Sequence, residues 1–106
     1  MIELNKDNYD AEVLEFQGIV MVDYWSPKCD PCMALMPDVE NMAEEFAGKV
    51  KVGKVNALEN RRLCIAQKVM GLPTFLFYVN GEKVAELNAE TVSVETIRAK
   101  LEELVA

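Results

Sequence analysis

The sequence contains no histidine, so no imidazole can serve as a catalytic base or as a metal ligand. Three cysteines among 106 residues are far too few for a disulfide scaffold. A structural zinc site typically needs about four cysteine or histidine ligands, so the same shortage leads us to expect no metal. No apolar stretch approaches the length of a membrane span, and the N-terminus carries early charges without the apolar core of a secretory signal.

Positive charge is also scarce, because 11 lysines and arginines face 18 acidic residues and leave a net charge of −7. Nucleic acids and anionic membranes both select basic surfaces, so neither is an expected partner. About half of the residues are hydrophobic, which is ordinary globular composition. We therefore expect one domain over residues 1–106, whose core needs no covalent cross-link. We also expect a monomer in a reducing cytoplasm, although the mature form of an exported protein would have the same composition.

The hydrophobic pattern predicts strands that alternate with helices. Helices are expected over 5–16, 31–46, 59–68 and 94–105, and strands over 19–25, 49–56, 74–79 and 82–87, after a weak strand at the N-terminus. Asp7 or Asn8 is the expected cap of the first helix, and Asn80-Gly81 predicts a tight hairpin turn. The order indicates an α/β fold with a central mixed β-sheet and helices on both faces.

The most informative motif is Cys29-Asp30-Pro31-Cys32, which lies between a predicted buried strand and a predicted helix. A disulfide that closes so short a loop gains little from chain entropy, so it is suited to being made and broken rather than to holding a fold together. The unpaired amides at a helix start favour a thiolate. We therefore expect Cys29 to attack a substrate disulfide and Cys32, one turn further in, to resolve the mixed disulfide.

The residues around the two cysteines have opposing charges. Lys28 would stabilise a thiolate at Cys29, whereas Asp30 would oppose it. Pro31 suits the first turn of a helix, where a missing N–H costs nothing. Both loop charges are screened by water, so the sequence leaves open which of them prevails.

Asp23 stands in the middle of an apolar strand, where an ionised carboxylate is costly without a partner or a function. One interpretation is a carboxyl of raised pKa that takes the proton from Cys32. The other is a buried ion pair with Lys54, from the next strand, that has no part in catalysis. The residues alone do not separate these two readings.

Two further positions allow a functional and an ordinary interpretation. Pro73 precedes a strand and could form a cis bond with Leu72, although most such bonds are trans and the bare sequence favours trans. Cys64 could be a third redox thiol, but its apolar neighbours favour a small buried hydrophobe. Most of the methionines fall at core spacing, with Met33 and Met70 as exceptions near the cysteines.

Taken in order, these pieces resemble the thioredoxin family over essentially the whole chain. The matching segments are Val22-Asp23-Tyr24-Trp25, Cys29-Asp30-Pro31-Cys32, Pro37 in the next helix, Lys54-Val55-Asn56, Gly71-Leu72-Pro73-Thr74 and Asn80-Gly81-Glu82. The resemblance implies a thioredoxin fold, a redox-active Cys29/Cys32 pair, Asp23 paired with Lys54 directly or through water, and a cis Pro73 facing the disulfide. That last implication reverses the preference for trans.

The resemblance also implies partners: protein substrates that contain disulfides, and a flavin-containing thioredoxin reductase as electron donor, with no cofactor in this chain. The residues expected to face the substrate are Trp25, Met33, Gly71, Leu72, Asn88 and Ala89.

Three positions depart from the family pattern. Lys28 replaces the usual tryptophan, Asp30 the usual glycine between the cysteines, and Asn88 a glycine that substrate backbone approaches. These departures bear on which reductase and substrates the protein uses more than on the reaction itself. Two alternatives therefore stay open: an electron carrier dedicated to one system, for example glycine reductase, or a redox-inert binding subunit.

Overall fold

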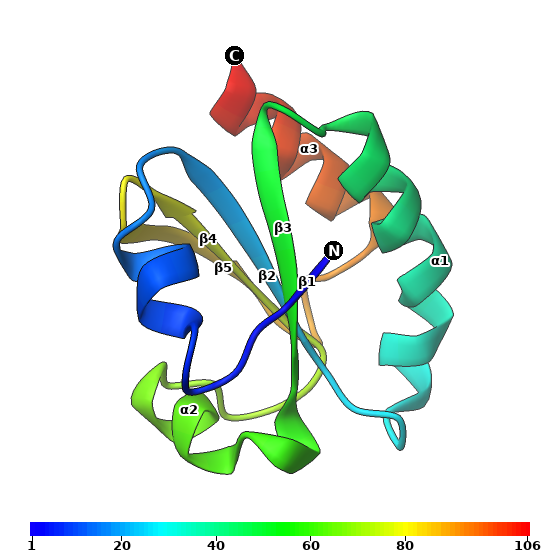
Figure 1. The fold of residues 1–106 in the computed structure, drawn as a ribbon. Helices are drawn as coiled ribbons and strands as arrows, with labels where there is room; N and C mark the ends of the chain where they lie inside the picture. The colour runs from blue at the N-terminus through cyan, green and yellow to red at the C-terminus, as the bar shows by residue number, and fades with distance from the viewer.

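The computed structural model of the chain describes residues 1–106, and its five strands form one mixed sheet (Figure 1). The strands are β1 (Ile2–Glu3), β2 (Ile19–Trp25), β3 (Val50–Asn56), β4 (Thr74–Val79) and β5 (Glu82–Leu87), in the spatial order β1-β3-β2-β4-β5. β1, β3 and β2 are parallel, whereas β4 is antiparallel to β2 and to β5. The predicted mixed sheet with its antiparallel hairpin is confirmed.

Helical elements cover both faces of this sheet. They are the π-helical turn η1 (Asp10–Leu14), α1 (Asp30–Glu45), the short 3₁₀ element η2 (Ala57–Glu59), α2 (Arg61–Ala66) and α3 (Val94–Val105). In Figure 1, α1 and α3 lie on one side of the strands, and η1 and α2 on the other. None of the helices is both long enough and apolar enough to cross a membrane.

Alternation along the central strand β2 supplies two separate cores. Val20, Val22 and Tyr24 point toward η1 and α2, and Met21 points toward α1 and α3. The core on the α1/α3 face contains Met21, Val39, Met42, Phe46, Val50, Val52, Phe75, Phe77, Ile97 and Leu101. Both sheet faces are buried, which explains why β2 reads as a nearly continuous apolar run.

The first helix is shorter than its prediction over 5–16, because only η1 (Asp10–Leu14) is helical. Tyr9 is its N-cap residue and makes no side-chain capping bond. The Asn5 side chain accepts from the backbone N–H of Asp7 at 2.8 Å, and Asn8 accepts from Asn5 at 2.8 Å. These local bonds compete with the helical backbone pattern and hold a turn instead. The proposed caps Asp7 and Asn8 were therefore wrong.

The element predicted over 59–68 is divided and ends earlier. Asn60 separates η2 from α2, and Lys68 has a left-handed backbone with φ of 60°. The N–H groups of Lys68 and Val69 bond back to Ile65 and Cys64 at 3.0 and 2.8 Å, which is the Schellman pattern. Lysine thus occupies the position that glycine usually fills, which concealed the helix end in the sequence.

The predicted hairpin turn is confirmed, since Asn80 and Gly81 both have positive φ, at 51° and 83°. A Cβ on Gly81 would clash with the carbonyl oxygen of Leu14. Glycine is therefore required both for its backbone angle and for the close approach of η1.

The strand register brings the chemically informative segments to one edge of the sheet. Trp25, at the end of β2, is paired with Asn56, at the end of β3. Tyr24 is paired with Thr74, at the start of β4, and Phe75 is paired with Leu87, at the end of β5. The segments that follow β2, β3 and β5 and the one that precedes β4 therefore converge there.

Candidate active site

Cys29 and Cys32 form a disulfide at the start of α1, with their Cα atoms 5.2 Å apart. Cys29 is the N-cap residue of the helix, and its sulfur accepts a hydrogen bond from the backbone N–H of Cys32 at 3.3 Å. Pro31 occupies the first turn, as expected. The sulfur of Cys29 thus lies where the free amides of the helix favour negative charge.

The two sulfur-bearing residues differ in accessibility. Cys29 is half-buried, whereas Cys32 is only 2% exposed. Lys28 and Asp30 are both exposed, and neither makes an ion pair. Water therefore screens both charges, and the difference in access between the cysteines is the larger asymmetry.

The loop before Cys29 is held by Ser26, a residue that the sequence analysis missed. Its side chain is 3% exposed, and its hydroxyl accepts from the backbone N–H of Lys28 at 3.0 Å. Its carbonyl accepts from the N–H of Cys29 at 3.1 Å. A serine before a proline is a common turn signal, and that signal could have identified it.

Asp23 is only 2% exposed and lies on the face of β2 that α1 covers, because it alternates with Met21. No hydrogen bond to its carboxyl group is present in the structure. Burial raises the pKa of Asp23 from its usual 3.8 to about 7, and the charge of Lys54 opposes that rise. The carboxyl can thus hold or release a proton near neutral pH.

Lys54 is the strand neighbour of Asp23, since their Cα atoms are register partners between β2 and β3. Its ammonium makes no ion pair, so the interpretation of Asp23 and Lys54 as a direct ion pair was wrong. The ammonium lies 5.4 Å from the centre of the Trp25 ring instead. The indole N–H of Trp25 is buried without a hydrogen-bond partner. Lys54 thus makes no direct ion pair with Asp23, but its charge still lowers the pKa of that carboxyl group.

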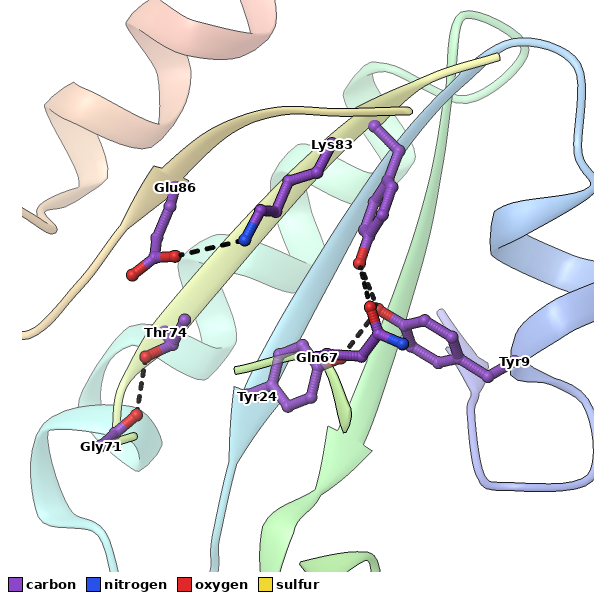
Figure 2. A network of polar contacts seen from close by, with 8 residues as sticks. Tyr9, Tyr24, Gln67, Gly71, Thr74, Lys83 and Glu86 are labelled. Carbon is purple, nitrogen blue, oxygen red and sulfur yellow. Dashed lines mark hydrogen bonds and ion pairs between the residues drawn. The ribbon is translucent and has the colours of Figure 1, made fainter. Parts of the chain in front are cut away.

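The Leu72–Pro73 peptide bond is cis, as the resemblance implies and contrary to the preference from the bare sequence. Pro73 is buried at the start of β4. The hydroxyl of Thr74 donates to the carbonyl of Gly71 at 2.6 Å and closes this loop (Figure 2). A cis bond requires tertiary context to hold it, which the local sequence does not contain.

The other residues expected to face the substrate have different degrees of exposure. Trp25 and Leu72 are half-buried, Met33 is 43% exposed, and Gly71, Asn88 and Ala89 are exposed. Asn88 does not adopt the left-handed backbone open to it. Its side chain accepts from the N–H of Glu90 at 3.0 Å and shapes its own turn.

Behind the site, three buried tyrosines share one hydrogen-bonded chain (Figure 2). Tyr24 donates to Tyr9 at 2.7 Å, the Tyr9 and Tyr78 hydroxyls are 2.9 Å apart, and Tyr78 donates to Gln67 at 3.1 Å. Sequence reasoning did not find this cluster, because its members come from four separate elements. It ties α2 and the segment before Pro73 to the sheet.

Cys64 is buried, as the ordinary interpretation predicts, and burial raises the pKa of its thiol. No three histidine, cysteine, aspartate or glutamate side chains come together as a candidate metal site.

Comparison with known proteins agrees with the geometry. The family model described as Thioredoxin matches residues 1–103. A thioredoxin of Peptoclostridium acidaminophilum is 48% identical over 95% of this chain and 92% of its own length. A thioredoxin of Acetoanaerobium sticklandii is 40% identical over 99% of this chain and 100% of its own.

A more distant relative, a thioredoxin of Buchnera aphidicola subsp. Schizaphis graminum, is 34% identical over 97% of this chain and 94% of its own length. The match thus covers the disulfide, the cis-proline loop and the whole sheet, so it is not confined to the C-x-x-C motif. The chain belongs to the thioredoxin family, and its Cys29–Cys32 pair is the active site of a thiol-disulfide oxidoreductase.

Proposed function

We propose that Cys29 is the attacking thiol and Cys32 the resolving thiol in the reduction of protein disulfides. The observation that carries this assignment is the contrast between the accessible Cys29 and the buried Cys32 at the start of α1. A thiolate must reach a substrate sulfur in order to react, and only Cys29 is placed to do so.

In the first step, the Cys29 thiolate attacks one sulfur of the substrate disulfide. A bond forms between Cys29 and that sulfur, and the second substrate sulfur leaves as a thiolate that takes up a proton. In the second step, Cys32 loses its proton and attacks the sulfur of Cys29. The Cys29–Cys32 disulfide forms and the remaining substrate thiol is released, so two electrons have passed to the substrate.

We assign Asp23 as the base that accepts the proton of the Cys32 thiol. It lies on the face of β2 against which α1 packs, and Cys32 is buried on α1. A pKa of about 7 lets its carboxylate accept a proton near neutral pH, when Cys32 must ionise in a poorly hydrated place. Lys54, register partner of Asp23, holds that pKa below the value that burial alone would produce.

The cis Pro73 loop supplies a surface for an extended substrate segment. Gly71, exposed, and Leu72, half-buried, precede Pro73 at the sheet edge where Trp25 and the loop after β5 also lie. The backbone N–H and C=O of Leu72 lie just before β4 and make no hydrogen bond within the protein, so they are free to pair with an extended peptide. Met33, Asn88 and Ala89 complete the proposed contact surface.

Membership of the family implies a thioredoxin reductase and disulfide-containing substrates in general. We further propose that the reductase is flavin-containing, and that the chain acts as a cytoplasmic monomer of one domain without binding nucleic acid. Lys28 and Asp30, exposed beside Cys29, tune the choice of partner. A dedicated carrier, for example to glycine reductase, is the second candidate, favoured by these same two residues.

Insulin reduction by the protein, with dithiothreitol as the electron source, tests the assignment of the two thiols. Cys29→Ser should abolish the protein-catalysed reduction. Cys32→Ser, reduced and then freed of dithiothreitol before insulin is added, should accumulate a mixed disulfide with insulin, visible by non-reducing electrophoresis. Cys64→Ser is the matched control and should retain the wild-type rate, because that thiol is buried. A mixed disulfide that forms in Cys29→Ser but not in Cys32→Ser would reverse the two roles.

A further inference from the structure

An apolar pocket of about 230 Å³ opens beside the cis-proline loop, away from the disulfide itself. It is lined by Ala57, Arg61, Cys64, Ile65, Val69, Met70, Gly71 and Leu72. Met70 is 93% exposed and Ile65 is 71% exposed, which leaves two large apolar side chains in water at its rim. Two exposed apolar side chains beside an apolar pocket form a candidate contact surface for another molecule.

The charge around this pocket is opposite to that of the whole chain. Residues 57–73 contain Arg61, Arg62 and Lys68 against a single acid, Glu59, although the net charge of the protein is −7. All three cations are exposed, and none makes an ion pair. Several cations elsewhere are paired with acids, for example Arg98 with Glu45. The segment is therefore locally basic on an acidic protein. Arg61 lines the pocket itself, and Arg62 lines the neighbouring hollow together with Asp7 and Glu59.

This basic segment is held in a fixed position next to the cis-proline loop of the active site. Gly71 and Leu72 line the pocket and lead directly into Pro73. Gln67 is tied to the tyrosine chain at 3.1 Å, and the turn after α2 is closed by its two backbone bonds. Little ordering is thus required when a partner binds, which favours affinity.

We propose that this surface, defined by Arg61, Arg62, Ile65, Lys68 and Met70, docks an acidic segment of the disulfide substrate protein. The segment would place one apolar side chain in the pocket and carboxylates beside the arginines, while its disulfide lies at Cys29. Opposite charge speeds the encounter and selects among partners, and the pocket adds a short-range requirement. A symmetric contact between two copies of this chain would bring two such basic surfaces together, so their repulsion disfavours it.

The inference rests on the proposed dithiol exchange, and the experiment separates the two. The fully reduced protein is mixed in a stopped-flow instrument with peptides that hold one internal disulfide and a flank of Glu-Leu-Glu, Lys-Leu-Lys or Glu-Ser-Glu. The fluorescence of Trp25, the single tryptophan, reports formation of the Cys29–Cys32 disulfide without any reductase. The second-order rate constant is compared at ionic strengths of about 0.02 and 0.5 M, where screening differs strongly.

The wild-type protein should prefer the Glu-Leu-Glu peptide over Lys-Leu-Lys by on the order of tenfold at low salt, and lose most of that preference at high salt. Arg61→Glu with Arg62→Glu should reverse the preference. Ile65→Ser should bring the Glu-Leu-Glu and Glu-Ser-Glu rate constants toward equality.

Two controls match these variants. Lys49→Glu with Lys83→Glu changes the net charge equally at exposed sites outside residues 57–73, and Val84→Ser removes an exposed apolar side chain on β5. Both should keep the peptide preferences of the wild type. If the controls act as strongly as the test variants, or all three peptides react equally, the docking surface is wrong and dithiol exchange stands. If a fully reduced wild-type protein oxidises with none of them, both proposals fail.

Discussion

The two faces of the sheet handle buried polar groups in opposite ways. On the η1/α2 face, the three tyrosine hydroxyls bond to one another and to Gln67. On the α1/α3 face, the carboxyl group of Asp23 is buried against an apolar core, and the charge nearest in register, Lys54, makes no ion pair with it. Figure 2 shows how closely the hydroxyls of the first group converge.

The difference separates a polar group that stabilises the fold from one that is costly to it. A satisfied hydrogen-bonded chain in a dry core rigidifies the structure, because every donor already has an acceptor. Burial raises the pKa values of Tyr9 and Tyr24 further above their usual range, so these phenols stay protonated. Burial raises the pKa of Asp23 to about 7, where its proton can move. An unpartnered acid is retained where chemistry uses it.

Removing the charge of Asp23 should produce the largest change in stability. Its pKa is about 7 in the folded protein and near 3.8 when unfolded, so the folded state binds more protons between these values. The contribution of Asp23 to the unfolding free energy should therefore be most favourable below pH 3.8, and should fall as pH rises toward 7. Above pH 7, the pKa difference corresponds to a loss of about 4 kcal/mol of unfolding free energy relative to low pH.

Asp23→Asn should accordingly stabilise the oxidised protein by several kcal/mol, about 4 at most, at pH 8, and by little below pH 4. Urea unfolding at a series of pH values measures this. The same variant should slow the release of substrate from the mixed disulfide, a kinetic effect that stability alone does not produce. A gain in stability that is equal at both ends of the pH range would show that Asp23 has the same pKa in the folded and the unfolded protein.

Breaking the tyrosine chain in the middle should give the next largest effect, with the opposite sign. Tyr9→Phe removes the acceptor of the Tyr24 hydroxyl and leaves a donor buried without a partner. Such a group costs about 2–3 kcal/mol of unfolding free energy. Urea unfolding at neutral pH measures the loss.

Tyr24→Phe is the matched comparison, because it removes a donor from the end of the chain and leaves the Tyr9–Tyr78 contact in place. Its cost should be closer to about 1 kcal/mol. Equal losses in the two variants would mean that ring packing, rather than hydroxyl pairing, holds the η1/α2 face together.

The smallest expected change concerns the end of α2 on the same face. Lys68 has a left-handed backbone, which a residue with a Cβ adopts at a cost. Lys68→Gly should relieve that strain and raise the unfolding free energy by up to about 1 kcal/mol. Ala66→Gly, two residues earlier at the last position of α2, should lower it by about half as much, because glycine is a poorer helix former than alanine. Thermal unfolding of the two variants would give shifts of opposite sign, and shifts of the same sign would contradict the Schellman assignment.

Elements with strong local signals were predicted closely. The strands over 74–79 and 82–87 and the helix over 94–105 agree with β4, β5 and α3, and Ser93 and Asn80-Gly81 mark the boundaries. The N-terminal helix was overestimated because asparagine side chains compete for the backbone, and periodicity does not register that competition. The end of α2 was missed because lysine occupies the left-handed position.

The C-x-x-C site follows a similar division. Its two cysteines, their place at a helix start and the unusual Asp23 all follow from residue type and spacing along the chain. The tyrosine chain and Ser26 did not, since each hydrogen-bond partner is supplied by a different element or by loop geometry.

The sequence by itself determined the order of strands and helices, the redox motif and the apolar alternation of β2, because these depend on neighbours in the chain. Only the tertiary structure decided that Leu72–Pro73 is cis, that Lys54 lies beside Trp25 rather than in an ion pair with Asp23, and that Arg61 and Ile65 stand beside the cis-proline loop. Those features depend on contacts between segments distant in sequence, and their free energies exist only once the sheet has brought the segments together.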